Sequence, residues 1–399
     1  MSQSVTTLEL ASQLPATAIR EPEFRLGHRP ELDGLRGVSI LLVLLHHLWF
    51  SFLPGGFLGV DVFFVLSGFL ITSLLVQEHE RYGRISLRHF YVRRALRLGP
   101  ALIVFMAGLG MYALCFLDRA KAAEIYQGIL LTASYVSNWV FALKPAVKIG
   151  PLGITWSLAI EEQFYLVWPL LLGLALRFKV SRRAIVYGLI LAILSIALHR
   201  RMLTEDGSAI RRLYYATDTR ADALLIGCLV ALLLSWRLIP QSRWFRPVIN
   251  AVAITGALFV IYLAGTADMP LLSLYLGWFT LVALAIGVNL IVLMLWPPAW
   301  ALQLLRTEPL VWFGRISYGV YLWHYPVRIF ICPDDENSSI SRVLLTAFVS
   351  IGIAALSFYL IEKRFLSLKD RFARTPLKRK EVVPIAAAGE EYLNQVGAL

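Results

Sequence analysis

The amino-acid sequence predicts an all-α, polytopic membrane protein with about ten transmembrane helices and one re-entrant or interfacial segment. Of its 399 residues, 58% are hydrophobic and only 16% are charged, and the mean hydropathy is +0.67. Apolar stretches of spanning length recur from about residue 38 to residue 361, with no interval typical of a soluble domain between them. A water-soluble domain of this size could not cover so much apolar surface with polar groups, so we expect the chain to lie in a membrane.

The loops between the apolar stretches define the expected helices in chain order. A further segment at 124–143 is also apolar, but counting it as a span would place the later basic loops on the outer side. We therefore expect this segment to be re-entrant or interfacial. The ten helices are expected at about 37–53, 57–77, 98–117, 156–176, 184–200, 219–236, 247–265, 271–296, 315–332 and 342–361.

Polar segments flank this membrane domain, which we expect to comprise residues 36–365. Residues 1–35 are mixed in charge and lack the short apolar run of a signal peptide, which predicts a cytoplasmic tail. Residues 366–399 begin with basic side chains and end in a stretch rich in Ala, Gly and Glu, which is typical of a disordered terminus.

Basic side chains are concentrated in alternate loops, and the positive-inside rule assigns these loops to the cytoplasm. This pattern predicts a multi-pass protein of the inner (plasma) membrane with both termini cytoplasmic. The intervening loops at 54–56, 266–268 and 333–336 are neutral or acidic. The basic positions are Arg81, Arg84, Arg88, Arg93, Arg94 and Arg97, then Arg177, Lys179, Arg182 and Arg183, then Arg237, Arg243 and Arg246, and a tail from Lys363 to Lys380.

One outer loop, at 200–220, is basic and breaks this alternation. A solvated arginine-rich loop is the favoured interpretation, because charge runs are usually solvated. Contact with a negatively charged acceptor and an error in the helix count are the alternatives.

The same placement of charge argues against several functional classes. A net charge of +12 that follows the membrane topology gives no reason to expect a nucleic-acid partner. The three cysteines, Cys115, Cys228 and Cys332, lie in or beside apolar stretches without CxxC or CxxH spacing, so we expect no metal site and no disulfide framework.

The first expected helix carries two side chains suited to acyl transfer. Arg36 lies at its cytoplasmic mouth and His47 eleven positions later, which places the imidazole roughly 16 Å deeper, near the midplane, on nearly the same helix face. A neutral histidine can accept the proton of an attacking hydroxyl, and arginine donates to phosphate oxygens. A histidine that only hydrogen-bonds between helices is the structural alternative.

Acidic side chains are expected toward the outer side of the same region. Asp61 on the second helix and Glu161 on the fourth lie at similar depth and could orient His47 or a sugar hydroxyl. An interhelical salt bridge to an arginine is the alternative for both.

Two further motifs lie near the ends of expected helices. Arg93 and Arg97 share a helical face in a cationic turn and could clamp a pyrophosphate, although topology alone would also place arginines there. His324 is expected near mid-membrane, where its aromatic neighbours favour a structural, hydrogen-bonded role over that of a second base.

Together these stretches resemble the acyltransferase-3 family of membrane acyltransferases, over about residues 29–365. The resemblance rests on five ordered blocks: Asp33-Gly34-Leu35-Arg36-Gly37 with His47; Gly56-Phe57-Leu58-Gly59-Val60-Asp61-Val62-Phe63-Phe64 with Ser67-Gly68; Arg93-Arg94-Ala95-Leu96-Arg97; Trp156-Ser157-Leu158-Ala159-Ile160-Glu161-Glu162-Gln163-Phe164-Tyr165; and Ile316-Ser317-Tyr318 with Tyr321-Leu322-Trp323-His324.

The resemblance implies both an activity and roles for particular residues. Members of the family modify surface polysaccharides, lipid-linked glycans and some macrolides, which implies acyl-CoA, in particular acetyl-CoA, as donor and a glycan or glycosylated molecule as acceptor. Arg36 and His47 match the family's arginine-x10-histidine motif, implicated in catalysis and donor handling. Arg93, Arg94 and Arg97 match its cytoplasmic arginine motif. Some members carry an appended SGNH-type esterase domain that is not visible here, so we expect the acyl group to reach its final acceptor or a separate partner.

The sequence therefore predicts a membrane-bound O-acyltransferase in which His47 activates an acceptor hydroxyl as general base, with a transient acyl-histidine as a variant. The alternative class is a transporter or flippase of glycolipids or small molecules, because polar residues at the midplane also mark substrate pathways.

Overall fold

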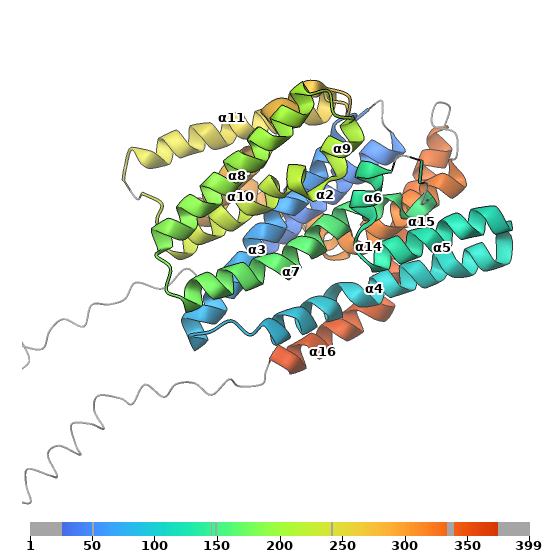
Figure 1. The fold of residues 1–399 in the computed structure, drawn as a ribbon, viewed down its shortest axis with the longest axis horizontal. Coiled ribbons are helices and arrows are strands. Elements are labelled where there is room, and N and C mark those ends of the chain that lie inside the picture. The colour runs from blue at the N-terminus through green and yellow to red at the C-terminus, as the bar shows by residue number, and fades with distance from the viewer. Residues whose placement is uncertain are drawn as a thin grey trace, which may run out of the picture.

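The computed structural model describes residues 26–49, 52–144, 146–147, 150–240, 242–332 and 339–373. Every regular element within these ranges is a helix, which confirms the predicted all-α fold (Figure 1). The longer helices are α2 (Pro30–Leu48), α3 (Gly59–Tyr82), α4 (Leu87–Phe116), α5 (Arg119–Ala133), α7 (Trp156–Arg177), α8 (Arg182–Glu205), α10 (Thr217–Ser235), α11 (Phe245–Thr266), α12 (Phe279–Leu295), α14 (Glu308–Ile331), α15 (Ile340–Ser357) and α16 (Lys363–Ala373). The shorter ones are η1 (Gly56–Leu58), α6 (Ser137–Leu143), η2 (Gly150–Thr155), α9 (Ile210–Tyr215), η3 (Leu274–Trp278), α13 (Ala299–Leu305) and η4 (Phe358–Glu362).

Each of the ten predicted spans corresponds to a helix, but they fall into two groups. Seven helical segments of the described chain are long and apolar enough to cross a bilayer: 56–82, 87–116, 150–177, 182–205, 245–266, 274–295 and 340–368. The other three, α2, α10 and α14, are more polar. Both α2 and α10 carry three charged side chains within 19 residues.

The polar helices are surrounded by protein. Their largest contact surfaces are with other helices, α2 against α14 and α10 against α3, and many of their side chains are buried. In contrast, α8 and α11 bury few of their apolar residues and expose many of them, as expected for helices that face lipid. The charged groups of α2 and α10 are thus kept away from lipid by neighbouring helices.

The segment at 124–143 forms parts of two short helices instead of one span. Helix α5 packs against α4 and turns at Tyr135, where φ is 53°, into α6 (Figure 1). Neither helix meets the length needed for a span.

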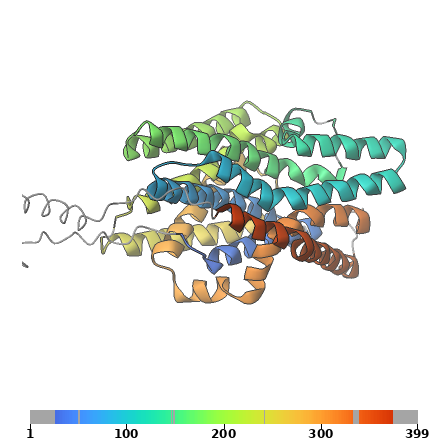
Figure 2. The same ribbon diagram turned by 90° about the horizontal axis from the view of Figure 1, so that it is seen from below.

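Three of the predicted basic loops lie at one end of the bundle. The connections α3–α4, α7–α8 and α10–α11 all lie at the left edge of Figure 1. The helix α16 lies along α4 near the same end, as Figure 2 shows from below. The expected acidic loop at 333–336, residues 1–25 of the expected N-terminal tail and the chain after residue 373 lie outside the described residues.

Several predicted boundaries are wrong by five residues or more, and two of them concern residues of the predicted site. Helix α4 begins at Leu87, so Arg93 and Arg97 belong to its first turns and not to a loop before a helix at 98. Helix α2 begins at Pro30, so Arg36 lies two turns inside it and not at its mouth. In both cases charged side chains continue the helix, because they face polar partners in the protein and not lipid.

The favoured interpretation of the basic loop at 200–220 is also wrong for two of its arginines. Arg200 and Arg220 are fully buried. Arg200 donates to both carboxylate oxygens of Asp222 and to Thr280, and Arg220 pairs with Asp61. Buried charges must be paired, and here the partners come from neighbouring helices.

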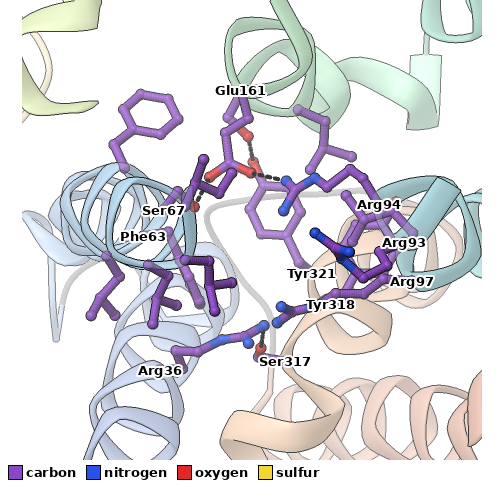
Figure 3. A pocket seen from close by; sticks show the side chains of 18 of the residues that line it. Arg36, Phe63, Ser67, Arg93, Arg94, Arg97, Glu161, Ser317, Tyr318 and Tyr321 are labelled. Carbon is purple, nitrogen blue, oxygen red and sulfur yellow. Dashed lines mark hydrogen bonds and ion pairs between the residues drawn. The ribbon is translucent and has the colours of Figure 1, made fainter. Parts of the chain in front are cut away.

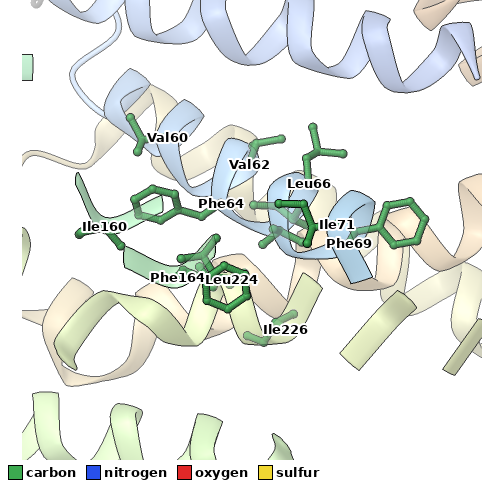
Figure 4. Packing of buried hydrophobic residues seen from close by; sticks show 14 of the residues in the cluster. Val60, Val62, Phe64, Leu66, Phe69, Ile71, Ile160, Phe164, Leu224 and Ile226 are labelled. Atoms are coloured by element: carbon green, nitrogen blue, oxygen red, sulfur yellow. The ribbon is translucent and has the colours of Figure 1, made fainter. Parts of the chain in front are cut away.

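Glycines allow the central helices to pack closely. A Cβ atom on Gly37 of α2 would collide with the carbonyl group of Leu310, and one on Gly314 of α14 with that of Asp33. Small residues at such contacts let helix backbones approach in a membrane. Beside this contact, apolar side chains of α3, α7 and α10 fill the core (Figure 4).

Candidate active site

A cavity of about 150 Å³ lies between α2, α3, α4, α7 and α14. Leucine, isoleucine and phenylalanine side chains of α3 form one wall, and four arginines from α2 and α4 reach into the space (Figure 3). The lining residues include every candidate for donor binding, namely Arg36, Arg93, Arg94 and Arg97, together with Glu161. The fold brings these residues together although the first and the last of them, Arg36 and Glu161, are far apart in the sequence.

Two of the four arginines are neutralised by carboxylates. Arg93 donates to Glu78 at 2.9 Å. Arg94 lies 3.3 Å from a carboxylate oxygen of Glu162 and 3.6 Å from one of Glu161, and its guanidinium group lies 3.5 Å from the centre of the Tyr165 ring. Their charges are therefore already balanced by the protein.

The other two arginines have no such partner. Arg36 donates to the hydroxyl of Ser317 at 3.0 Å, and within the described residues no carboxylate lies at ion-pair distance from Arg36 or Arg97. Their guanidinium groups point toward one another across the cavity (Figure 3). The buried carboxylate of Glu362 interacts electrostatically with both from η4, without an ion pair. Two unpaired cations side by side make this part of the cavity suited to an anion.

Glu161 lies at the cavity wall opposite Arg36. Its two carboxylate oxygens accept hydrogen bonds from Ser67 at 2.8 Å and from Tyr165 at 3.1 Å, besides the contact with Arg94. The structure does not bring it to His47, and its visible role is to hold Arg94 in place.

Asp61 lies outside the cavity. It accepts two hydrogen bonds from Arg220, at 2.9 and 3.1 Å, and both side chains are 1% exposed. The Arg220 guanidinium also lies 3.7 Å from the centre of the Phe279 ring. This arrangement matches the interhelical salt bridge that the sequence left open as the alternative for Asp61.

His47 does not line the cavity. Its ring packs against His324 and Tyr325, with centroid separations of 4.9 and 5.6 Å. His47 therefore faces protein side chains. The expectation that Arg36 and His47 lie on one face of α2 agrees with their contacts, since both side chains face α14.

Two hydroxyl groups separate the cavity from the histidines. Tyr321 and Ser157 line the cavity and lie 2.5 Å apart at their oxygens, and Tyr321 also donates to the carbonyl oxygen of Ile154. The ring of His324 follows one turn along α14, 5.7 Å from that of Tyr321.

Sequence reasoning named the charged groups of the site but missed its hydroxyl groups. Ser67, Ser157, Ser317 and Tyr321 all line the cavity. Each lies inside one of the blocks that carry the family resemblance, so the signal was present, but serine and tyrosine are common in membrane helices for other reasons. Within the described residues no group of three or more His, Cys, Asp or Glu side chains is arranged to hold a metal ion.

The fold and this cavity define a multi-helix protein of membrane type with a buried, arginine-rich site. The chain belongs to the acyltransferase-3 family, whose acyltransferase-domain model matches residues 29–362. This match confirms the resemblance seen in the sequence.

The curated relatives that match this chain include peptidoglycan O-acetyltransferases. The chain is 34% identical over 345 residues to a putative peptidoglycan O-acetyltransferase, YrhL, of Bacillus subtilis, covering 84% of this chain and 54% of the relative. It is 36% identical over 346 residues to the peptidoglycan O-acetyltransferase OatA of Listeria monocytogenes, covering 84% of this chain and 55% of the relative. The chain thus spans about half the length of these relatives. No solved structure matches it.

Proposed function

We propose that this protein transfers an acetyl group from acetyl-CoA on the cytoplasmic side of the plasma membrane to a hydroxyl group of a glycan. The family and the peptidoglycan O-acetyltransferases among its relatives support the reaction class and the acceptor class. The observation that carries the proposal for the donor is the pair of unpaired guanidinium groups, Arg36 and Arg97, in one buried cavity.

The donor binds with its phosphate groups on these two arginines. Coenzyme A is a polyanion, and arginine offers planar, permanently charged donors that match phosphate oxygens. Arg93 and Arg94, which are paired with carboxylates, shape the cavity and contribute less to the binding of charge. The apolar wall formed by α3 accommodates the less polar end of the donor.

His47 acts as the general base. The acceptor hydroxyl gives its proton to His47 while its oxygen attacks the carbonyl carbon of the thioester. The carbon–sulfur bond then breaks, and the coenzyme A thiolate takes the proton back from the imidazolium. In the variant with an acyl-histidine, the imidazole nitrogen attacks the thioester first and coenzyme A leaves as its thiolate. The hydroxyl oxygen then attacks the acyl carbon, the bond to the imidazole nitrogen breaks, and the hydroxyl proton goes to the thiolate.

The remaining predicted site residues act less directly. Glu161 positions Arg94, and Asp61 holds α3 to α10 through Arg220. The acceptor approaches from the outer side, where the glycan or lipid-linked glycan lies, so His47 stands between the donor and the acceptor.

Purified full-length protein incubated with acetyl-CoA radiolabelled in the acetyl group tests this proposal. The acceptor probe is an oligosaccharide of alternating N-acetylglucosamine and N-acetylmuramic acid. Label that becomes covalently attached to the sugar, with release of free coenzyme A thiol, supports acetyl transfer. Binding of the glycan without any release of thiol contradicts it and favours the transporter alternative.

A further inference from the structure

His47 of α2 and His324 of α14 form a hydrogen-bonded pair. The Nδ1 atom of His47 lies 3.3 Å from the Nε2 atom of His324, and the rings meet edge to face. His324 is completely buried on α14, and nothing in the proposed reaction has yet used it.

Backbone carbonyl groups determine which nitrogen of each ring carries hydrogen. The Nδ1 atom of His324 lies 3.0 Å from the carbonyl oxygen of Val320, and that of His47 lies 2.9 Å from the carbonyl oxygen of Val43. A carbonyl oxygen can only accept, so both Nδ1 atoms carry a hydrogen. In the neutral ring of His324 the Nε2 atom is then without hydrogen and can only accept.

The hydrogen on His47 Nδ1 is therefore shared between two acceptors, the Val43 carbonyl oxygen and His324 Nε2. This leaves the electron pair of His47 on Nε2, on the opposite side of the ring from both acceptors. That is the nitrogen with which a general base must face its substrate.

We propose that His324 is a positioning residue for His47: its Nε2 atom accepts from His47 Nδ1–H, orients the imidazole and stabilises the imidazolium that forms when His47 takes the acceptor's proton. A buried neutral histidine thus has the role that a carboxylate has in a catalytic triad, in which a third group fixes the tautomer of the base. This inference rests on the proposed role of His47 as base.

A neutral partner suits this step. After His47 takes a proton on Nε2, its Nδ1–H still points at two acceptors, so no hydrogen bond has to be broken. The bond from Nδ1–H becomes charge-assisted and therefore stronger, which favours the protonated state during transfer.

Substitutions at position 324 separate this role from packing. In His324→Gln the side-chain oxygen can reach the place of Nε2 and accept from His47, whereas His324→Leu fills a similar volume without an acceptor. Release of coenzyme A thiol from acetyl-CoA by the full-length protein, with the alternating aminosugar oligosaccharide as acceptor, gives kcat and KM. We expect His324→Leu to lower kcat by roughly 10- to 100-fold with an unchanged KM for acetyl-CoA, and His324→Gln to restore most of the loss.

Two further measurements make the outcome specific. His47→Ala alone is expected to abolish turnover, whereas His324→Leu should only reduce it, because His324 acts through His47 and does not itself take the proton. Melting temperatures of all variants in detergent identify those that fold.

The results that overturn the inference differ from those that overturn the proposed function. Wild-type kcat in a folded His324→Leu variant, or equal losses in the Leu and Gln variants, removes the positioning role while leaving His47 as base. Turnover by His47→Ala removes the proposed role of His47 itself and the inference with it.

Discussion

Arginine side chains in the cavity differ in what surrounds them, although they look alike in sequence. Arg93 and Arg94 have carboxylate partners, and Arg36 and Arg97 do not. The sequence could identify all four, since arginines near membrane helices are conspicuous, but it could not divide them. That division depends on Glu78, Glu161 and Glu162, which lie on α3 and α7 and meet the arginines of α4 only in the folded protein.

Because Arg97 has no carboxylate partner among the described residues of the cavity, its substitution should weaken donor binding more than substitution of an exposed arginine on the same helix. Arg97→Gln removes an unpaired charge from the cavity and should raise the Kd for acetyl-CoA by roughly 10- to 100-fold, the loss expected for a charged hydrogen bond. Arg88→Gln is the matched control, because Arg88 is an exposed residue of α4 that does not line the cavity. Equilibrium binding of radiolabelled acetyl-CoA to both purified variants measures the difference, and equal affinities would refute the assignment of the anion site.

The ion pair between Asp61 and Arg220 predicts a stability effect. Breaking a buried pair leaves an uncompensated charge and commonly costs about 3–5 kcal/mol, whereas replacing both partners by apolar residues costs much less. We therefore expect Asp61→Leu and Arg220→Leu each to lower the melting temperature in detergent strongly, and the double variant to recover part of the loss. If the double variant were less stable than either single variant, the pair would not be what holds α3 to α10.

At the scale of the element, the helices were predictable and their ends were not. Hydropathy finds a helix wherever lipid or a lipid-like core surrounds it, and all ten expected spans are helices. The first turns of α2 and α4 were missed because charged residues there form ion pairs inside the protein. The hydropathy of a single segment does not show which partners its charged residues will have. The contact between His47 and His324 was missed for a similar reason, since it depends on how closely α2 and α14 pack.

The glycines between α2 and α14 predict how sensitive that contact is. Gly37→Leu would place a side chain against the backbone at Leu310, so α2 and α14 must separate. We expect acetyl transfer to fall at least tenfold, because His47 moves away from His324. Gly188→Leu is the control, since Gly188 of α8 has open space beside it, and similar losses of acetyl transfer in the two folded variants would show that the close contact is unimportant.

At the scale of the whole molecule, the alternating charges predict which end of the bundle faces the cytoplasm. The basic connections α3–α4, α7–α8 and α10–α11 share one end (Figure 1), and the α8–α9 connection lies at the other. The structure shows that these three connections share one end of the bundle, and the positive-inside rule predicts that this end faces the cytoplasm.

Single cysteines at the two ends test the orientation. In a background where the exposed Cys115 is replaced by Ala, Arg84→Cys and Asp206→Cys each place a thiol at an exposed position, one at each end. A maleimide that cannot cross membranes should label Asp206→Cys in intact cells and Arg84→Cys only after the membrane is opened. The reverse labelling pattern would contradict the proposal that the donor binds from the cytoplasmic side and the acceptor from the outer side.

We propose that arginines hold the donor while His47 carries out the chemistry. The most direct measurement compares acetyl-CoA affinity and acetyl transfer in the purified wild-type protein and in His47→Ala. We expect the variant to bind acetyl-CoA with wild-type affinity and to transfer no acetyl group to the aminosugar oligosaccharide, because Arg36 and Arg97 remain in place and only the base is lost. Transfer at the wild-type rate by His47→Ala would contradict this proposal.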